Sequence, residues 1–319
     1  MINNIKWLFF TVLIFLLSMP FSVSALRDDV AISEAIKNFK TTDNNVVIYI
    51  RDDVYHDYMR FLNGRKVQDI NDFSGQFIRR DVVDMILAQQ ALLLGGFNKQ
   101  FSYQIGKVNF RNTKLLEQGE LLLSFDSYWS QDANALSDKV FISDPVIRKG
   151  EYFSGVFTSP SNRKVFEIKH LSDFSQLTSV STPRWRTDWD TLSALPLKSL
   201  TREDEWLSQV RMVSMQWIDF MLMPLMPEIN NHYILENINL KAVPKVLMLL
   251  DDSRHYVVSK LHPDGKRAYK SLQQGLQLLR KQGLIEKAYR QAGFIPDLTD
   301  KLIINLPVSH KPAQSSSLK

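Results

Sequence analysis

The chain has 319 residues, a formal net charge of +5 and no cysteine. Without cysteine it can form neither disulfides nor thiolate metal sites. Its charged residues are spread along the chain, without the blocks of like charge typical of nucleic-acid-binding tails, so we expect no nucleic-acid partner.

The N-terminal residues 1–25 have the features of a secretory signal peptide. Lys6 supplies the positive charge, residues 7–17 form a short apolar run, and residues 23–25 form a small-residue cleavage pattern. The run is short for a membrane span, although an uncleaved N-terminal anchor is the alternative. We expect cleavage after Ala25 and a mature protein in the periplasm.

The first part of the mature chain predicts a β-α-β unit. Residues 45–50 read as an apolar strand after a turn, and residues 54–62 favour an extra helix. Between residues 80 and 94, apolar side chains share one face, which predicts a helix that ends at the glycine pair 95–96. Alternation over residues 101–110 predicts a second strand, parallel to the first.

The stretch 115–150 continues this pattern and opens a candidate ligand site. A helix end stopped by Gly119 precedes an apolar run of strand length at 121–125, and a second strand follows from residue 140. In an open α/β sheet, the ligand lies where a strand opens into a loop. Tyr128 and Trp129 follow the apolar run, so both are candidate ligand-binding residues.

The order of a helix, a glycine, a strand, a loop and Phe-x-Ser-x-Pro in this stretch resembles the first lobe of the bacterial extracellular solute-binding proteins of family 3. The resemblance covers residues 44–294. It implies the α/β, two-lobed type 2 periplasmic-binding-protein fold, in which each lobe is a mixed sheet flanked by helices and two crossing strands form the hinge. Lobe 1 then comprises residues 26–148 and 252–319, and lobe 2 comprises residues 149–251.

The rest of the chain follows the same order of elements. On the resemblance, residues 151–158 and 246–250 form the two crossings between the lobes. The other elements predicted are a strand at 179–181, a helix opened by 182–189, a helix over 201–213, a strand at 256–260 and a helical pair over 268–292 broken at Gly283.

The resemblance also implies ligand contacts from both lobes. The loop after the first strand supplies an aromatic contact in the family, which makes Tyr55 a candidate with Asp52 behind it. The alternative is a surface loop with nothing bound. On lobe 2, a helix N-terminus holds an anionic group of the ligand, and Arg184 and Trp185 lie at that position here. A solvated surface position is the alternative for Arg184.

The pair of residues with which this family usually holds amino acids is missing. An Arg shortly before Phe-Ser-x-Pro binds the ligand carboxylate in the family, whereas residues 135–139 contain no Arg. The Asp that binds the ammonium group falls near Met223 and Pro224. We therefore expect a small polar or anionic ligand rather than a free amino acid.

No pattern in the sequence indicates catalysis, a metal or a cofactor. The six histidines are isolated, and neither a Gly-x-Ser-x-Gly turn nor a phosphate-binding glycine loop occurs. We expect a monomeric, non-enzymatic solute-binding protein that delivers a small-molecule ligand to a membrane permease or sensor. A signalling or interaction protein that regulates a membrane partner is the alternative, and an enzyme on this fold, such as a dehydratase, is a third.

Overall fold

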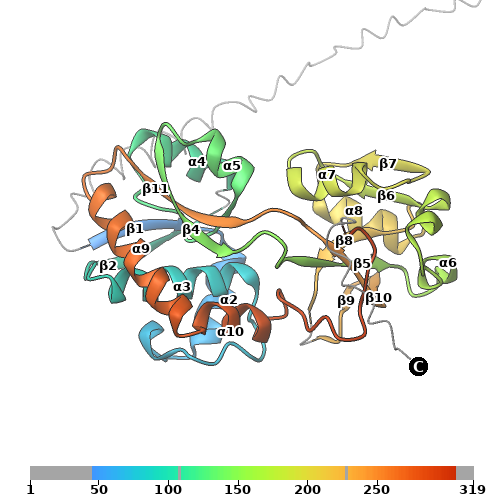
Figure 1. Cartoon of the computed structure of the whole chain (residues 1–319), viewed down its shortest axis with the longest axis horizontal. Helices are drawn as coiled ribbons and strands as arrows, with labels where there is room; N and C mark the ends of the chain where they lie inside the picture. The colour runs from blue at the N-terminus through green and yellow to red at the C-terminus, as the bar shows by residue number, and fades with distance from the viewer. Residues whose placement is uncertain (1–44, 107–108, 227–228, 307–319) are drawn as a thin grey trace, which may run out of the picture. The chain divides into compact units, whose positions relative to one another are not determined.

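The structure is a computed structural model that describes residues 45–106, 109–226 and 229–306. The predicted signal peptide lies outside the described residues. Within them, none of the helices is long and apolar enough to cross a membrane. The helices and strands gather in two α/β lobes, as Figure 1 shows. The two-lobed α/β fold expected from the sequence is therefore confirmed.

The first lobe begins with the predicted β-α-β unit. Strands β1 (Asn45–Ile50) and β2 (Gln100–Ile105) pair in parallel along their whole length. Helices α2 (Asp52–Leu62) and α3 (Arg80–Leu94) connect them. Residues 81–92 of α3 are all buried, so this helix lies inside the lobe rather than on its surface.

A second sheet of the first lobe is built around β11 (Arg254–Ser259). This strand pairs antiparallel with β3 (Tyr128–Trp129) and with β4 (Val140–Ile147). Helix α5 (Ser130–Ala135) follows β3 directly. Strands β3 and β4 therefore lie beside β11, which comes more than a hundred residues later in the chain.

The apolar run 121–125 differs from its prediction. All five residues are buried, but the run forms no regular strand and makes one isolated bridge, between Leu123 and Val258. A short apolar run indicates that the segment is buried. Its pattern alone does not distinguish a strand from a buried loop. Helix α4 (Asn109–Gln118) ends as predicted at Gly119, which has the left-handed φ of +79°.

The C-terminal helical pair covers the first lobe. It consists of α9 (Gly265–Lys281) and α10 (Leu284–Gln291), separated at Gly283 as the sequence predicted. Helix α9 packs very closely against α3. A Cβ atom added at Gly275 would lie 1.8 Å from the backbone oxygen of Ala91, so only glycine permits this approach.

The second lobe contains a mixed sheet in the order β12-β10-β5-β8, with β9 also paired to β10. Strands β5 (Phe153–Thr158) and β10 (Ile238–Leu249) run antiparallel and include most of the two predicted crossing segments. The other strands of this sheet are β8 (Met221–Pro224), β9 (His232–Leu235) and β12 (Leu302–Ile303).

The C-terminal strand β12 pairs in parallel with β10, so residues 302–303 join the sheet of the second lobe. This segment was predicted to belong to lobe 1 with the rest of residues 252–319. A two-residue strand carries no periodicity from which the pairing could be predicted. The remaining boundaries of the lobes stay a prediction.

The second lobe also contains a parallel pair of short strands, β6 (Thr178–Ser181) and β7 (Ser199–Arg202). The helix predicted to start at residue 201 starts later, because residues 199–202 pair with β6. The remaining helical elements are α6 (Arg163–Phe166), α7 (Arg186–Ser193), α8 (Trp206–Ser214) and the short 3₁₀ helices η1 (Val67–Asp69) and η2 (Leu171–Gln176).

The close packing of α9 on α3 gives a test of the fold. Alanine favours an isolated helix over glycine by about 1 kcal/mol. At Gly275, however, the added methyl group overlaps the backbone of Ala91, so Gly275→Ala should lower the free energy of unfolding by about 1–3 kcal/mol. Urea denaturation measures this change.

Gly106→Ala is the matched control, since nothing lies within 4 Å of a Cβ atom at Gly106. This substitution should leave the free energy of unfolding within about 0.5 kcal/mol of the wild type. Wild-type stability in Gly275→Ala would contradict the packing of α9 on α3.

Candidate functional site

Arg254 lies at the centre of the candidate site. It is the first residue of β11 and pairs with Trp129 of β3. Its guanidinium carbon lies 4.5 Å from the centroid of the Trp129 ring. Its Nε donates to the hydroxyl of Ser127 at 2.9 Å, and its Nη2 donates to the backbone oxygen of Ser127. Arg254 is buried, so these contacts fix its orientation beside the indole ring.

Arg80, the first residue of α3, supplies a second cation to the site. Its Nη1 lies 2.6 Å from Oδ2 of Asp84 and 2.7 Å from Oδ1 of Asp126, and its Nη2 contacts Asp81. Burial opposes the charged form of Asp81, but Arg80 and the neighbouring Arg79 lower the pKa of this carboxyl to about 2. The start of α3 is therefore a dense network of ion pairs.

Asp84 joins the two arginines through Ser127. This carboxylate is fully buried and accepts hydrogen bonds from the backbone nitrogen of Ser127 at 3.0 Å and from its hydroxyl at 2.6 Å. The hydroxyl of Tyr289 donates to its other oxygen. Burial raises the pKa of Asp84, and the guanidinium groups of Arg80 and Arg254 oppose that rise. Because Ser127 donates to Asp84, its hydroxyl oxygen is oriented to accept from Arg254.

Asp126 is the exposed member of this cluster. Its side chain is 54% accessible to solvent, and Oδ1 lies 3.8 Å from Nη2 of Arg254 in addition to its contact with Arg80. Trp129 meets Tyr152 edge-on, with 5.3 Å between the ring centroids. The site therefore combines two largely buried guanidinium groups, one accessible carboxylate and an aromatic wall.

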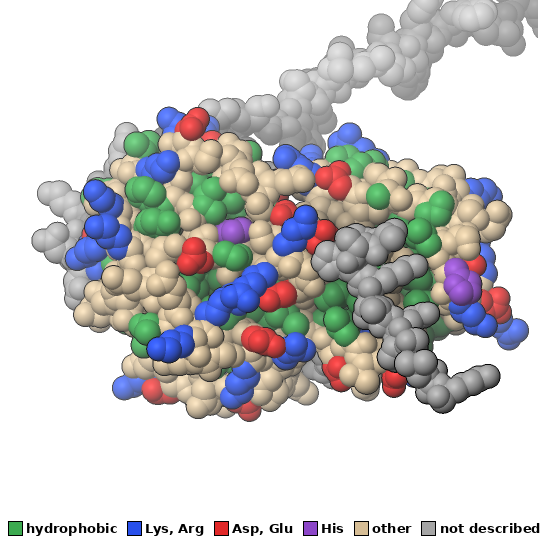
Figure 2. Space-filling view, viewed as in Figure 1, with side chains coloured by type: hydrophobic (Ala, Val, Ile, Leu, Met, Phe, Trp, Pro, Cys, Tyr) green, Lys and Arg blue, Asp and Glu red, His purple; other side chains and the backbone are tan. Residues whose placement is uncertain are grey.

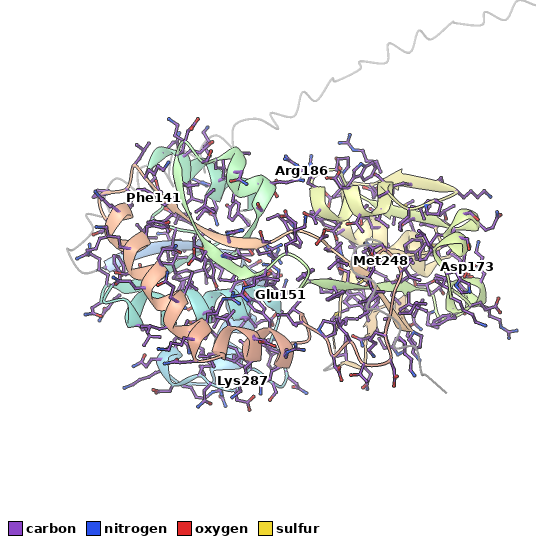
Figure 3. All side chains as sticks on the ribbon, viewed as in Figure 1. Phe141, Glu151, Asp173, Arg186, Met248 and Lys287 are labelled. Atoms are coloured by element: carbon purple, nitrogen blue, oxygen red, sulfur yellow. The ribbon has the colours of Figure 1, made fainter. Side chains whose placement is uncertain are left out.

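The first turn of α7 supplies residues of the second lobe to the same site. Burial raises the pKa of Asp188 to about 6, and Arg254 and Arg80 of the first lobe oppose the rise. Arg186 forms an ion pair with Asp132 of α5, with 3.7 Å between Nη2 and Oδ1. Figure 3 labels Arg186 at the start of α7. These interactions bring the start of α7 opposite the residues around Arg254.

Of the residues predicted from the sequence, Trp129 lies directly in this cluster. Tyr128 precedes it in β3, and its hydroxyl lies 3.3 Å from the hydroxyl of Thr113. Burial raises the pKa of Tyr128 to about 12, so its hydroxyl stays protonated. Both residues pair with β11, and their contacts with a ligand stay a prediction.

Tyr55 and Asp52 lie on a helix rather than in the loop that the resemblance implied. Helix α2 starts at Asp52, immediately after β1. The ring of Tyr55 packs against Tyr103 of β2, with 5.5 Å between the centroids, and Asp52 is exposed. The neighbouring Asp53 accepts a hydrogen bond from Arg79 at 3.0 Å. A ligand contact by Tyr55 or Asp52 stays a prediction.

Arg184 and Trp185 lie immediately before α7, as the sequence predicted. Nη2 of Arg184 lies 3.6 Å from Oδ2 of Asp204, and 54% of its side chain is exposed. Trp185 occupies the N-terminal cap position of α7 and is 37% exposed. Their contribution to ligand binding stays a prediction.

Sequence reasoning missed Arg80, Asp84, Arg254 and Asp188 as site residues. The sequence does contain a signal for Arg80 and Arg254. Each is the first residue of an apolar helix or strand, and a cation is unfavourable in an apolar core unless it has a specific partner. Among the described residues, no group of His, Asp or Glu side chains is arranged to hold a metal ion.

No family model matches the chain, and no curated protein matches it either. Similar solved structures include a mutant of ArgBP from T. maritima, with 12% identity, a TM-score of 0.47 and coverage of 81% of this chain and 98% of that one. An amino-acid ABC transporter substrate-binding protein from Streptococcus pneumoniae, bound to L-arginine, has 15% identity, a TM-score of 0.49 and coverage of 83% and 98%.

The probable amino-acid ABC transporter extracellular-binding protein ytmK from Bacillus subtilis has 11% identity, a TM-score of 0.49 and coverage of 80% and 99%.

The raised pKa of Asp188 predicts a pH-dependent stability. Between its usual value of 3.8 and about 6, the folded chain holds a proton on Asp188 that the unfolded chain has lost, so the stability falls as the pH rises through this window. Asp188→Asn removes the titration and the charge. At neutral pH the variant should be more stable than the wild type by about 1–3 kcal/mol, with the difference vanishing below roughly pH 4.

Urea denaturation at several pH values measures this difference. Asp190→Asn is the control, since Asp190 is an exposed carboxylate two residues further along α7. It should shift the free energy of unfolding by less than about 0.5 kcal/mol at every pH. A constant difference between Asp188→Asn and the wild type across the window would show that Asp188 titrates normally.

Proposed function

We propose that this chain is a periplasmic solute-binding protein that holds a small polar ligand with an anionic group between its two lobes. The observation that carries the proposal is the buried guanidinium of Arg254, stacked on Trp129 and placed opposite Asp188 of the second lobe. A fixed guanidinium group beside an aromatic plane is suited to bind a carboxylate or phosphate group of a small organic molecule.

The cations of the site are held in place before a ligand arrives. Ser127 and Asp84 fix Arg254 and Arg80 through hydrogen bonds, so little side-chain freedom is lost on binding. Asp126 lies between both guanidinium groups and is accessible to solvent. A ligand anion that approaches Arg254 would share these cations with Asp126, which favours a singly charged anionic group over a highly charged one.

The second lobe adds a carboxyl group, that of Asp188, to the guanidinium groups of the first lobe. Because the pKa of Asp188 is about 6, its carboxyl is mainly ionised at neutral pH and can accept a hydrogen bond. A hydrogen-bond acceptor at Asp188 and a cation at Arg254 recognise different parts of one ligand. A small hydroxy acid has both a carboxylate for Arg254 and a hydrogen-bond donor for Asp188.

Ligand binding in this arrangement would favour an approach of the two lobes. The lobes are joined through the segments next to β5 and β10, which act as the hinge in the proposal. A closed form differs in surface from the open form, and a membrane permease or a sensor can recognise that difference. Delivery to such a membrane partner is the function that we infer for the closed form.

A thermal-shift screen identifies the ligand. The panel pairs hydroxy acids, amino acids and phosphate esters with neutral analogues of the same size. A ligand at 100 times its dissociation constant should stabilise the protein by about 2.7 kcal/mol. Small-angle scattering should then show a smaller radius of gyration with that ligand. Stabilisation by the neutral analogues alone would contradict an anion site.

The role of Arg254 is tested with the ligand that the screen finds. Arg254→Lys keeps the charge but loses the fork-shaped geometry and the stacking on Trp129, so the affinity should fall by at least about 1.5 kcal/mol. Arg202→Lys is the matched control, because Arg202 on β7 is 63% exposed and pairs with Asp204. Calorimetry measures both affinities, and an equal effect of the two substitutions would remove Arg254 from the binding site.

A further inference from the structure

A second pocket lies beside α7 on a different face of the helix from Asp188. Its volume is approximately 510 Å³. From α7 it is lined by residues 187, 190, 191 and 194, which share one face because their spacing is i, i+3, i+4 and i+7. Asp188 is outside this set. The other walls come from the segments near residues 149 and 249–252 and from residues 304–306 after β12.

Two polar atoms of the pocket residues lack a partner among the described residues. Thr187 is 7% exposed, and its hydroxyl has no hydrogen bond. Oδ2 of Asp252 is also buried without a partner, whereas its Oδ1 accepts from the backbone nitrogen of Ser253 at 2.8 Å. Buried polar atoms are nearly always satisfied in proteins, so these two atoms are candidates for hydrogen bonds to a group from outside the chain.

The charges around the pocket define the class of that group. Asp190, Asp251 and Asp252 line it together with one cation, Lys149. Lys149 lies 3.4 Å from Oδ2 of Asp251 and neutralises that carboxylate. The remaining two carboxylates give the pocket a net negative charge, so it favours a cation.

The pocket also has an apolar part. Leu195, Leu249 and Ile304 are buried and supply an aliphatic wall. Asn305 holds this wall, because its amide donates to the backbone oxygen of Leu249 at 2.9 Å and accepts from the backbone nitrogen of the same residue at 2.8 Å. Since the Asn305 amide is already used, the unpartnered atoms of Thr187 and Asp252 are the groups on which the proposal depends.

We propose that this pocket is a binding site for a small organic cation, such as an alkyl amine. Its ammonium group donates to Oδ2 of Asp252 and to the hydroxyl of Thr187, and its hydrocarbon part packs on the aliphatic wall. The proposal is independent of the anionic ligand at Arg254. It assigns a second ligand of opposite charge to the other face of α7.

Calorimetry with 1,5-diaminopentane as the probe tests the charge preference. The neutral analogue 1,5-pentanediol and the anionic analogue glutarate have the same chain length. The diamine should bind at least about tenfold more tightly than either analogue, which is the usual effect of one charge-assisted hydrogen bond. Absence of diamine binding, or equal binding of the diol, would overturn the proposal.

Substitutions then locate the bound amine. Asp252→Asn and Thr187→Val should each weaken diamine binding, by about tenfold for the aspartate and by less for the neutral hydroxyl. Thr187→Ser keeps the hydroxyl and should keep the affinity. Asp138→Asn removes an exposed carboxylate in the turn before β4 and is the control.

The same experiment separates this site from the site at Arg254. If Arg254→Lys weakens diamine binding while Asp252→Asn does not, the amine binds between Arg254 and Asp188, and the second site is disproved. If Asp252→Asn weakens diamine binding and Arg254→Lys does not, the amine binds in this pocket. That result supports the second site whether or not an anionic ligand is found for Arg254.

Discussion

The buried carboxylate of Asp84 is the constraint on which the candidate site depends. A carboxylate inside the lobe is costly unless it is hydrogen-bonded and paired. Asp84 meets this requirement with donors from its own helix and from two distant parts of the chain, namely Arg80 at the start of α3, Ser127 before β3 and Tyr289 of α10. The hydroxyl of Tyr256 in β11 also donates to its backbone oxygen at 2.6 Å. One acid thereby fixes the elements from which the site is built.

The position of Arg254 follows from this constraint. Ser127 donates its hydroxyl proton to Asp84 and accepts from Arg254, so the acid orients the guanidinium group through one intermediate side chain. Trp129 then covers one face of that group. The proposed function therefore depends on a buried hydrogen-bond network as much as on a charge.

Helix α7 separates two environments of different chemistry. Asp188 lies within the field of Arg254 and Arg80, whereas Thr187 and Asp190 line a pocket with excess negative charge. Elsewhere, acidic and basic side chains alternate over the face shown in Figure 2, in agreement with the dispersed charges of the sequence. The selectivity that we propose therefore depends on local arrangements of charge rather than on the net charge.

The sequence by itself determined the elements of this protein, because apolar periodicity and glycine act locally. It placed β1, α3 and the helical pair broken at Gly283, and their order indicated two α/β lobes. It also selected Trp129 from the loop that follows a buried run. Only the tertiary structure decided the partners of that residue. Arg254 reaches Trp129 across 125 positions of sequence through antiparallel pairing of β3 with β11, and no periodicity encodes the pairing of such distant strands.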